Sequence, residues 1–312
     1  MPVFGLFGAL TMEVNMKHFI SIQSISRERI DELLDRAEQI ARHHPTGRPL
    51  SEKILGLLFF EPSTRTRMSF ESSMLRLGGQ CLNLGGAESS VMKGETLADT
   101  IRVVDGYVDA IVLRHPRIGA SQLSTEFSSV PIINAGDGAG QHPSQTLIDL
   151  YTIRQSFPLD GLDVGLLGDL HYGRTTHSLA YALAKYGVTI HTISPKGLGF
   201  PLSVKRSLTR SGACVVEHES IKAALPYLDV LYVTRIQRER FPDPASHYDT
   251  LHSYRITPEL LSDAPKHLIV LHPLPRVDEI DPGVDALPHA KYFEQAKNGI
   301  PVRMALLLGV MK

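Results

Sequence analysis

Short apolar runs alternate with helical patterns along this chain of 312 residues, and this alternation limits the folds that it can adopt. The runs show no polar alternation, so each predicts a strand that is buried on both faces, as in a parallel sheet. A first series lies at 54–60, 110–113 and 130–133, and a second at 163–167, 188–193, 230–233 and 268–271. The pattern therefore predicts an α/β protein with two mostly parallel sheets flanked by helices.

The helical patterns divide this α/β chain into two domains. Helices are predicted at 27–42 with Ser26 as N-cap, from Ser63 to the glycines at 78–79, at 96–106, at 144–154, at 174–186 before Gly187, and from Thr257 and Pro258 onward. At roughly 150 residues per domain, the length also indicates two domains. We expect a first domain over 16–150, a second over 151–291, and a last helix at about 292–312 that returns to the first. The helix at 144–154 is the natural bridge between them.

The composition fits two buried cores and argues against a polyanion partner. Hydrophobic residues make up 43% and charged residues 21% of the chain, which is typical of globular domains. The 32 Lys and Arg residues are balanced by 33 Asp and Glu residues, so the chain has no global positive field for DNA or RNA. We therefore expect no nucleic-acid partner.

The cysteines and the N-terminal residues predict the cellular compartment of the protein. Cys81 and Cys214 are too few for a disulfide framework and lack the paired spacing of a zinc site, which favours a reducing cytoplasm. The apolar patch near the N-terminus has no basic segment before it, and no apolar run reaches the ~18 residues of a membrane span. We expect a cytoplasmic protein with a ragged N-terminal extension and no membrane partner, and Met16 is an alternative start.

Polar residues, arginines above all, follow the predicted strands at their carboxyl ends. In open parallel sheets the ligand crevice lies at that edge, so the site is expected in the cleft between the two domains. The residues in these positions are Ser63, Thr64, Arg65 and Thr66 in FFEPSTRT, Arg114 in IVLRHP, Arg174 in GDLHYGRTTHS, Arg235 in YVTRIQ, and Leu274, Pro275 and Arg276 in VLHPLPR.

These arginines predict a substrate, or a pair of substrates, with several negative charges. The guanidinium group offers a planar fork of donors that suits phosphate and carboxylate groups. A single arginine is more often one half of a surface ion pair. The repetition at strand ends favours a shared anion site instead.

Two further segments carry polar groups that could serve chemistry. His142 and Gln145 lie between a strand and a helix, where an imidazole could donate to a carbonyl oxygen or an oxyanion, although a lone histidine is more often a helix cap or a core residue. Lys93 lies in a polar loop, where a lysine is usually just solvated. The chain has no GxGxxG after a strand, no GxxxxGK[ST], no HExxH and no GxSxG. Nicotinamide, nucleotide-hydrolysis and serine-hydrolase functions therefore lose their usual support.

Together these motifs resemble those of the aspartate carbamoyltransferase catalytic chains. The STRT segment marks the wider family of aspartate and ornithine carbamoyltransferases, and the matching segments run from FFEPSTRTRMSFE to the C-terminus. KGETLADT, GDLHYGRTTHSL and HPLPRVDEI favour aspartate over ornithine as the acceptor, and the HCLP and SMG segments typical of ornithine enzymes are absent. One departure is Met92, which stands where well-studied relatives have a second lysine.

The resemblance implies a role for each residue that matches a motif. Carbamoyl phosphate and aspartate would share one site, with Lys93, Arg65, Thr66, Arg114 and His142 as its catalytic groups. The phosphate would bind Ser63, Thr64, Arg65 and Thr66; the carbamoyl group would bind Thr66, Arg114, His142, Gln145 and the backbone of Leu274 and Pro275; and the aspartate would bind Lys93, Arg174, Arg235 and Gln237.

The resemblance also implies a reaction and an assembly. The α-amine of L-aspartate would attack the carbamoyl carbon, and N-carbamoyl-L-aspartate and phosphate would leave, an early committed step of de novo pyrimidine (UMP) biosynthesis. No metal and no organic cofactor is called for. In the family, the loop that contains Ser89 and Lys93 enters the site of a neighbouring subunit, so a homotrimer with shared sites is expected. Whether regulatory chains join it is left open.

Two other functions compete with this one. A carbamoyltransferase that acts on another amino acid would be favoured if Arg174 and Arg235 failed to act on a dicarboxylate. A non-catalytic relative that only binds ligand or serves as a partner subunit would be expected to have an eroded site, whereas Arg65, Lys93 and His142 are all present.

Overall fold

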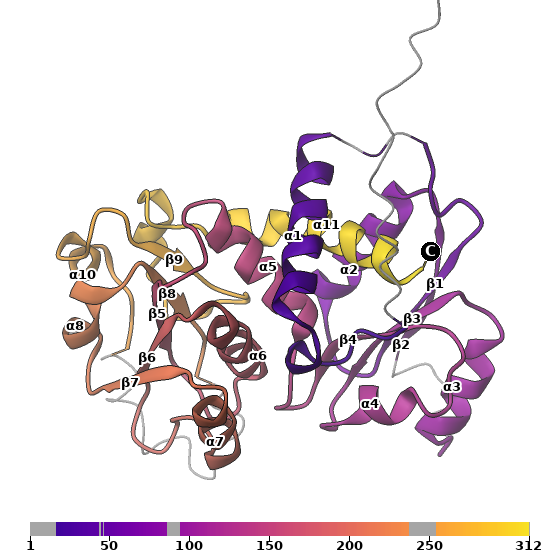
Figure 1. Ribbon diagram of the computed structural model, residues 1–312, viewed down its shortest axis with the longest axis horizontal. Helices are drawn as coiled ribbons and strands as arrows, with labels where there is room; N and C mark the ends of the chain where they lie inside the picture. The colour runs from indigo at the N-terminus through magenta and orange to yellow at the C-terminus, as the bar shows by residue number, and fades with distance from the viewer. Residues whose placement is uncertain (1–16, 44, 46, 86–93, 237–253, 312) are drawn as a thin grey trace, which may run out of the picture.

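Two parallel sheets form the framework of the molecule. The computed structural model describes residues 17–43, 45, 47–85, 94–236 and 254–311 (Figure 1). The first sheet has the strand order β2-β1-β3-β4 and the second has the order β7-β6-β5-β8-β9, with parallel pairing throughout. Their strands are β1 (Ile54–Phe59), β2 (Gln80–Gly85), β3 (Ala110–His115), β4 (Ile132–Asp137), β5 (Asp163–Leu167), β6 (Thr189–Ile193), β7 (Cys214–His218), β8 (Val230–Val233) and β9 (Ile269–Leu271).

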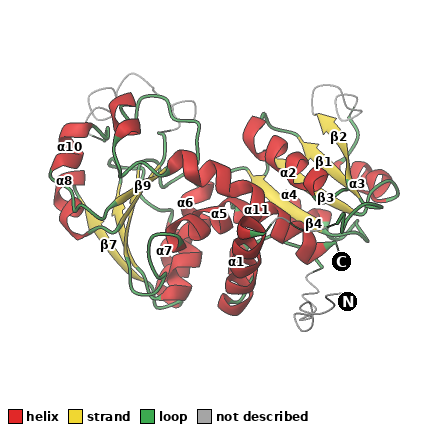
Figure 2. Cartoon of the chain, turned by 90° about the horizontal axis from the view of Figure 1, so that it is seen from above, coloured by secondary structure: helices red, strands yellow, loops and turns green. Residues whose placement is uncertain are grey.

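Helices lie on both sides of each sheet and connect successive strands (Figures 1 and 2). This arrangement confirms the predicted α/β class. The helices are α1 (Arg27–Arg42), α2 (Thr64–Arg76), α3 (Leu97–Asp105), α4 (Ala120–Ser124), α5 (Pro143–Arg154), α6 (Arg174–Leu183), α7 (Leu202–Arg210), α8 (Ile221–Ala224), α10 (Pro258–Ser262) and α11 (Tyr292–Val310).

The apolar runs predict the strands that are largely buried. Every residue of β8 and β9 is buried, as are all but the last two of β3, because helices cover both faces of these strands. The strands β2 and β7 have no counterpart among the predicted runs. Each lies at one edge of its sheet, and its residues are exposed or only partly buried, whereas the opposite edge strands β4 and β9 are fully buried. The exposed edges therefore carry no uniform apolar signal.

Helix starts follow their capping residues. The side chain of Ser26 accepts a hydrogen bond from the backbone N–H of Arg29 at 3.2 Å, as the predicted N-cap of α1 requires. The hydroxyl of Thr257 accepts in the same way from Leu260 at 3.3 Å at the start of α10. These caps set where each helix begins and therefore where the preceding loop ends.

Two helices join the halves of the molecule. Both α5, which links the two sheets in sequence, and α11 lie between the lobes in the two ribbon views (Figures 1 and 2). The helix α11 packs against α1, α2 and α5, and it also contacts β9 of the second sheet. One apolar cluster contains Leu55 of β1, Val164 of β5 and Leu306 of α11, so the two halves share a continuous core.

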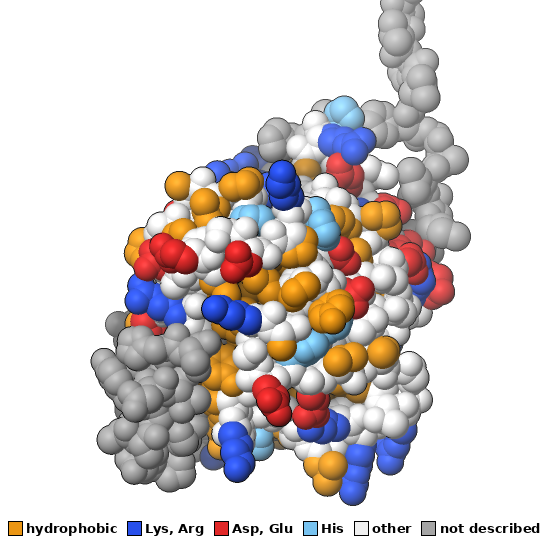
Figure 3. Space-filling model, turned by 90° about the vertical axis from the view of Figure 1, so that its left-hand side faces the viewer, with side chains coloured by type: hydrophobic (Ala, Val, Ile, Leu, Met, Phe, Trp, Pro, Cys, Tyr) orange, Lys and Arg blue, Asp and Glu red, His pale blue; other side chains and the backbone are white. Residues whose placement is uncertain are grey.

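The surface carries charges of both signs. Figure 3 looks at the end formed by the second half, where lysines and arginines are scattered among aspartates and glutamates. This mixture is what a formal net charge of −1 predicts. Within the described parts of the chain, the helices are all too short or too polar to cross a membrane.

Candidate active site

The first part of the site is built where β1 gives way to α2. Ser63 is the N-cap of α2 but makes no capping bond with its side chain. Its hydroxyl instead accepts from Arg114 Nη1 at 3.2 Å, so it lies beside the carboxyl end of β3. The first turn of α2 contains Thr64, Arg65 and the buried Thr66. A helix start of this kind presents backbone N–H groups and the positive end of the helix dipole, which suits an anion.

Glu61 ties the two halves together at this edge. Its Oε2 atom accepts from Arg114 Nε at 3.3 Å and from Arg174 Nη1 at 2.9 Å. Arg114 follows the apolar part of β3 in the first half, and Arg174 opens α6 in the second. One carboxylate therefore holds arginines from both halves at a single point. The sequence reasoning missed this role, although an acidic residue directly after a buried strand, within FFEPSTRT, is a signal that could have suggested it.

Burial and like charge act on Arg114. Both effects lower its pKa to about 10, with burial as the larger cause, Arg174 as the next, and Glu61 opposing them. The guanidinium group stays protonated near neutral pH because this value is well above 7. Arg114 and Arg174 carry two positive charges, and Glu61 supplies only one negative charge. The site therefore keeps a local positive charge that an anion can neutralise.

Arg174 reaches its position through space that glycine leaves open. A Cβ atom at Gly136, where φ is +116°, would lie only 3.0 Å from Arg174 Cζ. Arg174 Nη1 also donates to the carbonyl oxygen of Gly138 at 3.1 Å. The end of β4 thus forms a backbone cradle for a side chain of the other half.

His142 is the N-cap of α5 and is buried. Its backbone N–H donates to Ser178 Oγ of α6 at 2.8 Å, and its Nδ1 atom lies 3.4 Å from Ser144 Oγ. Burial lowers the pKa of His142 well below its usual value, and the nearby Arg174, Arg114 and Arg303 lower it further. The imidazole is therefore neutral at physiological pH and able to donate one N–H.

Gln145 and Leu274 belong to two different elements, because Gln145 lies on α5 and Leu274 follows β9. Gln145 Nε2 donates to Asp149 Oδ1, one turn later on α5, at 2.8 Å. Leu274 follows β9 with φ of 52°, and the Leu274–Pro275 bond is cis. The backbone N–H of Leu274 donates to Nδ1 of His272 at 2.8 Å. Arg276, which also follows β9, is committed elsewhere, because it forms a two-pronged ion pair with Asp285.

The remaining residues predicted for the site differ in burial, and some of them lie outside the described parts of the chain. Arg65 is exposed, while Arg235 is partly buried two residues after β8. Ser89, Lys93 and Gln237 lie outside the described residues, as does Met92. The structure therefore brings together Ser63, Arg114 and Arg174 through hydrogen bonds that include Glu61, and it places His142 beside these arginines.

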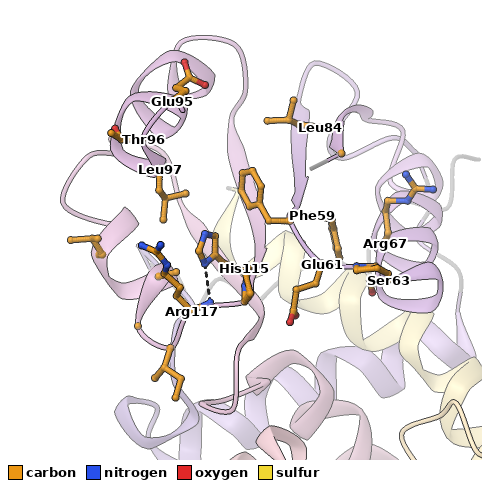
Figure 4. A pocket seen from close by; sticks show the side chains of 18 of the residues that line it. Phe59, Glu61, Ser63, Arg67, Leu84, Glu95, Thr96, Leu97, His115 and Arg117 are labelled. Carbon is orange, nitrogen blue, oxygen red and sulfur yellow. Dashed lines mark hydrogen bonds between the residues drawn. The ribbon is translucent and has the colours of Figure 1, made fainter. Parts of the chain in front are cut away.

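A cavity of about 1300 Å³ opens at the carboxyl ends of β1, β2 and β3. Glu61, Ser63 and Thr64 line it, and so does Arg67 of α2. Figure 4 shows Glu61 and Ser63 on the segment that leaves β1, with the start of α3 across the cavity. All of its lining residues come from the first half, between residues 59 and 123. The cavity is therefore an open approach to the anion site and does not enclose it.

Comparison with known proteins identifies the family. Residues 17–155 match the profile of the aspartate/ornithine carbamoyltransferase carbamoyl-P binding domain, and residues 160–310 match that of the Asp/Orn binding domain. The aspartate carbamoyltransferase catalytic subunit of Methanospirillum hungatei is 68% identical over 297 residues, which cover 95% of this chain and 100% of that protein.

Solved structures agree with these matches. The catalytic subunit of M. jannaschii aspartate transcarbamoylase superposes with a TM-score of 0.86 at 51% identity, covering 95% of this chain and 98% of that one. The aspartate transcarbamoylase of Trypanosoma cruzi, in complex with carbamoyl phosphate and aspartate, gives a TM-score of 0.91 at 37% identity, covering 96% and 98%. This chain belongs to the aspartate/ornithine carbamoyltransferase family, and within it to the aspartate carbamoyltransferase catalytic subunits.

Proposed function

We propose that this chain transfers the carbamoyl group of carbamoyl phosphate to the α-amine of L-aspartate. The products are N-carbamoyl-L-aspartate and phosphate, and the reaction is an early step of de novo pyrimidine biosynthesis. The observation that carries the proposal is the meeting of Arg114 and Arg174 at Glu61, which places cationic groups of both halves at one point. Two small anionic substrates, one held by each half, suit this arrangement.

The phosphate group binds at the start of α2 in this proposal. Ser63, Thr64, Arg65 and Thr66 supply hydroxyl groups, backbone N–H groups and one guanidinium group. Thr66, Arg114 and the neutral His142 donate to the carbamoyl oxygen, with Gln145 and the backbone carbonyls of Leu274 and Pro275 around the carbamoyl nitrogen. Arg174, Arg235, Gln237 and Lys93 bind the carboxylates of aspartate.

The bond changes follow from this placement. The amine nitrogen forms a bond to the carbamoyl carbon, the oxyanion that develops is stabilised by Arg114 and His142, and the bond from carbon to the phosphate oxygen breaks. The amine proton passes to the departing phosphate. Each donor to such an oxyanion typically lowers the barrier by about 2.7–4 kcal/mol. Holding two anions that repel each other in water provides much of the remaining acceleration.

An acceptor assay tests the function. Carbamoyl phosphate is offered with a panel of amino acids, and L-aspartate is expected to be carbamoylated while L-ornithine is not. Turnover of ornithine alone would support the alternative, a carbamoyltransferase for another amino acid.

The variant Arg174→Ala tests the division of roles between the two halves. We expect a steep rise in the aspartate KM, while carbamoyl phosphate binding, measured by calorimetry, stays nearly unchanged. Equal loss of affinity for both ligands contradicts the proposed division of roles.

The same proposal includes a homotrimer with shared sites. Its support is the face formed by α2 and the edge strand β2, where Met68, Leu75 and Leu82 are 59%, 58% and 49% exposed. Mixing inactive Lys93→Ala chains with inactive Arg65→Ala chains is expected to restore part of the activity. No recovery in verified mixed trimers contradicts shared sites. A native mass measurement on the protein purified from its own cells reports whether regulatory chains are bound. The cytoplasmic location of the protein stays a prediction.

A further inference from the structure

A buried carboxylate on α5 lies behind the proposed carbamoyl site. Asp149 is fully buried, and its Oδ1 atom accepts two hydrogen bonds from side-chain amides. One comes from Gln145 Nε2 of α5 at 2.8 Å, and the other from Gln295 Nε2 of α11 at 2.7 Å. The carboxylate therefore joins the two helices that connect the halves of the molecule.

The second of these amides continues the chain of hydrogen bonds. Gln295 Oε1 accepts from the backbone N–H of His272, the residue directly after β9, at 2.9 Å. His272 Nδ1 accepts in turn from the backbone N–H of Leu274 at 2.8 Å. Because Nδ1 is an acceptor, the proton of the neutral ring is on Nε2, which donates to Glu279 at 2.7 Å. An unbroken path thus runs from Gln145 to Leu274.

The ends of this path are two groups assigned to the same substrate. Gln145 and the backbone at Leu274 come from elements on opposite halves, and both are placed around the carbamoyl group by the proposed function. We propose that Asp149 is a positioning residue for carbamoyl transfer, and that through Gln145 on one side and Gln295 and His272 on the other it sets the separation of these two groups. The inference rests on the proposed function and adds to it a residue that touches no substrate.

The surroundings of Asp149 indicate that its role depends on the two hydrogen bonds from the amides more than on a negative charge of its side chain. Burial raises the pKa of Asp149 to about 7, while the amides and Arg303 oppose this rise. Arg303 of α11 and Tyr232 of β8 are the titratable groups that act on it from the packed elements. Oδ1 can accept hydrogen bonds from both amide N–H groups whether the carboxyl group is charged or neutral. Asp149→Asn keeps such an oxygen, so we expect its kcat within about threefold of the parent chain.

A change of one amide to an acid tests the path. Gln295→Glu keeps the acceptor for His272 but replaces the donor to Asp149 with an oxygen. Two carboxyl groups then face each other, and because burial and like charge both raise the pKa of such a pair, they share a proton near neutral pH and lose it as the pH rises. We expect kcat to fall roughly 100-fold at about pH 9, to recover in part toward about pH 7, and to fall more than carbamoyl phosphate affinity. The double variant Asp149→Asn with Gln295→Glu restores a donor and is expected to recover kcat at the higher pH.

The chain offers a matched control one turn further along the same helices. Asn298 Nδ2 donates to Thr152 Oγ1 at 3.0 Å and to Gln155 Oε1 at 2.7 Å, so it also joins α11 to α5. Asn298→Asp makes the same amide-to-acid change away from Gln145 and Leu274. It is expected to lower the unfolding temperature and to leave kcat within about threefold. A purely structural role for the α5–α11 contact predicts instead that both variants lose activity alike.

These experiments distinguish a failure of the proposed function from a failure of the positioning role of Asp149. If the parent chain fails to carbamoylate aspartate, the proposed function is wrong. If the parent is active and folded Gln295→Glu matches its kcat, or if the double variant shows no recovery, the positioning role is wrong. Gln295→Met removes the same bonds without adding charge and serves where Gln295→Glu does not fold. Full activity of Gln295→Met also overturns the proposal.

Discussion

At the scale of single residues, the site depends on how a few buried charges are paired. Glu61 is the counter-charge of both Arg114 and Arg174, and each of the three side chains is less than a quarter exposed. Removing one partner from such a group leaves charges that are neither paired nor hydrated. The arginines could be predicted from their places after apolar runs. The pairing of both arginines with Glu61 could not, because it depends on where α6 of the other half brings Arg174.

The first prediction concerns this carboxylate. Glu61→Gln is expected to lower the free energy of unfolding by about 1–3 kcal/mol, because two guanidinium groups lose their common negative charge and keep only a neutral acceptor. Inorganic phosphate is expected to restore more stability to this variant than to the parent, measured as the shift in Tm. Glu217→Gln, which breaks an exposed pair with Lys205, is the control and should change the stability by less than about 0.5 kcal/mol. Equal effects of the two substitutions would contradict the role of Glu61.

The second prediction concerns the charge of His142. Burial and three arginines lower its pKa, so the ring keeps its neutral form at pH values where an ordinary histidine gains a proton. In an NMR titration, the ring protons of His142 are expected to keep constant shifts from about pH 8 down to about pH 5.5. Free histidine in the same buffer provides the reference for the ordinary transition. A transition of His142 near the ordinary value would show that its burial and neighbours are not as described.

At the scale of elements, buried and exposed strands differ in how far sequence predicts them. The runs at 163–167 and 230–233 coincide with β5 and β8, because neighbours on both edges and helices on both faces require apolar residues throughout. The edge strands β2 and β7 form although their patterns are mixed. Their positions follow from pairing with β1 and β6, which is a tertiary interaction.

The third prediction concerns the end of β4. Gly136→Ala places a methyl group 3.0 Å from Arg174 Cζ, so the guanidinium group has to shift from the position in which it donates to Glu61. We expect the aspartate KM to rise roughly 10-fold with little change in carbamoyl phosphate affinity. Gly187→Ala, where φ is +64° and the added Cβ meets no atom within 4 Å, controls for backbone strain. That control is expected to lower stability and to leave both constants unchanged.

At the scale of the whole molecule, the two halves are tied through α5 and α11. The helix at 144–154 was recognised as a bridge from its place between the two series of strands, and the structure has α5 there. The packing of α11 on α1, α2 and α5 brings the last residues of the chain back to the first sheet. The hydrogen bonds of Gln295 and Asn298 across this contact have no signal in periodicity.

The fourth prediction concerns assembly. Leu75→Glu puts a charge on the exposed face of α2, where Leu75 is 58% exposed, and we expect the native mass to shift from trimer toward monomer with loss of activity. The matched control is Leu202→Glu on α7, where Leu202 is 62% exposed in the second half. It should keep the parent's mass and activity. A Leu75→Glu chain that remains trimeric would move the proposed interface away from α2.

The amino-acid sequence alone predicts the α/β class, the buried strands, the capped starts of α1 and α10, and the arginines at strand ends. These features depend on local rules, because burial on two faces requires an apolar run and a helix start requires a capping oxygen. The tertiary structure alone decided that Glu61 joins Arg114 to Arg174, that Arg276 pairs with Asp285, and that Asp149 links Gln145 to Gln295. Such pairings need two elements far apart in the chain to meet at hydrogen-bond distance, and only the packing of the two halves sets that distance.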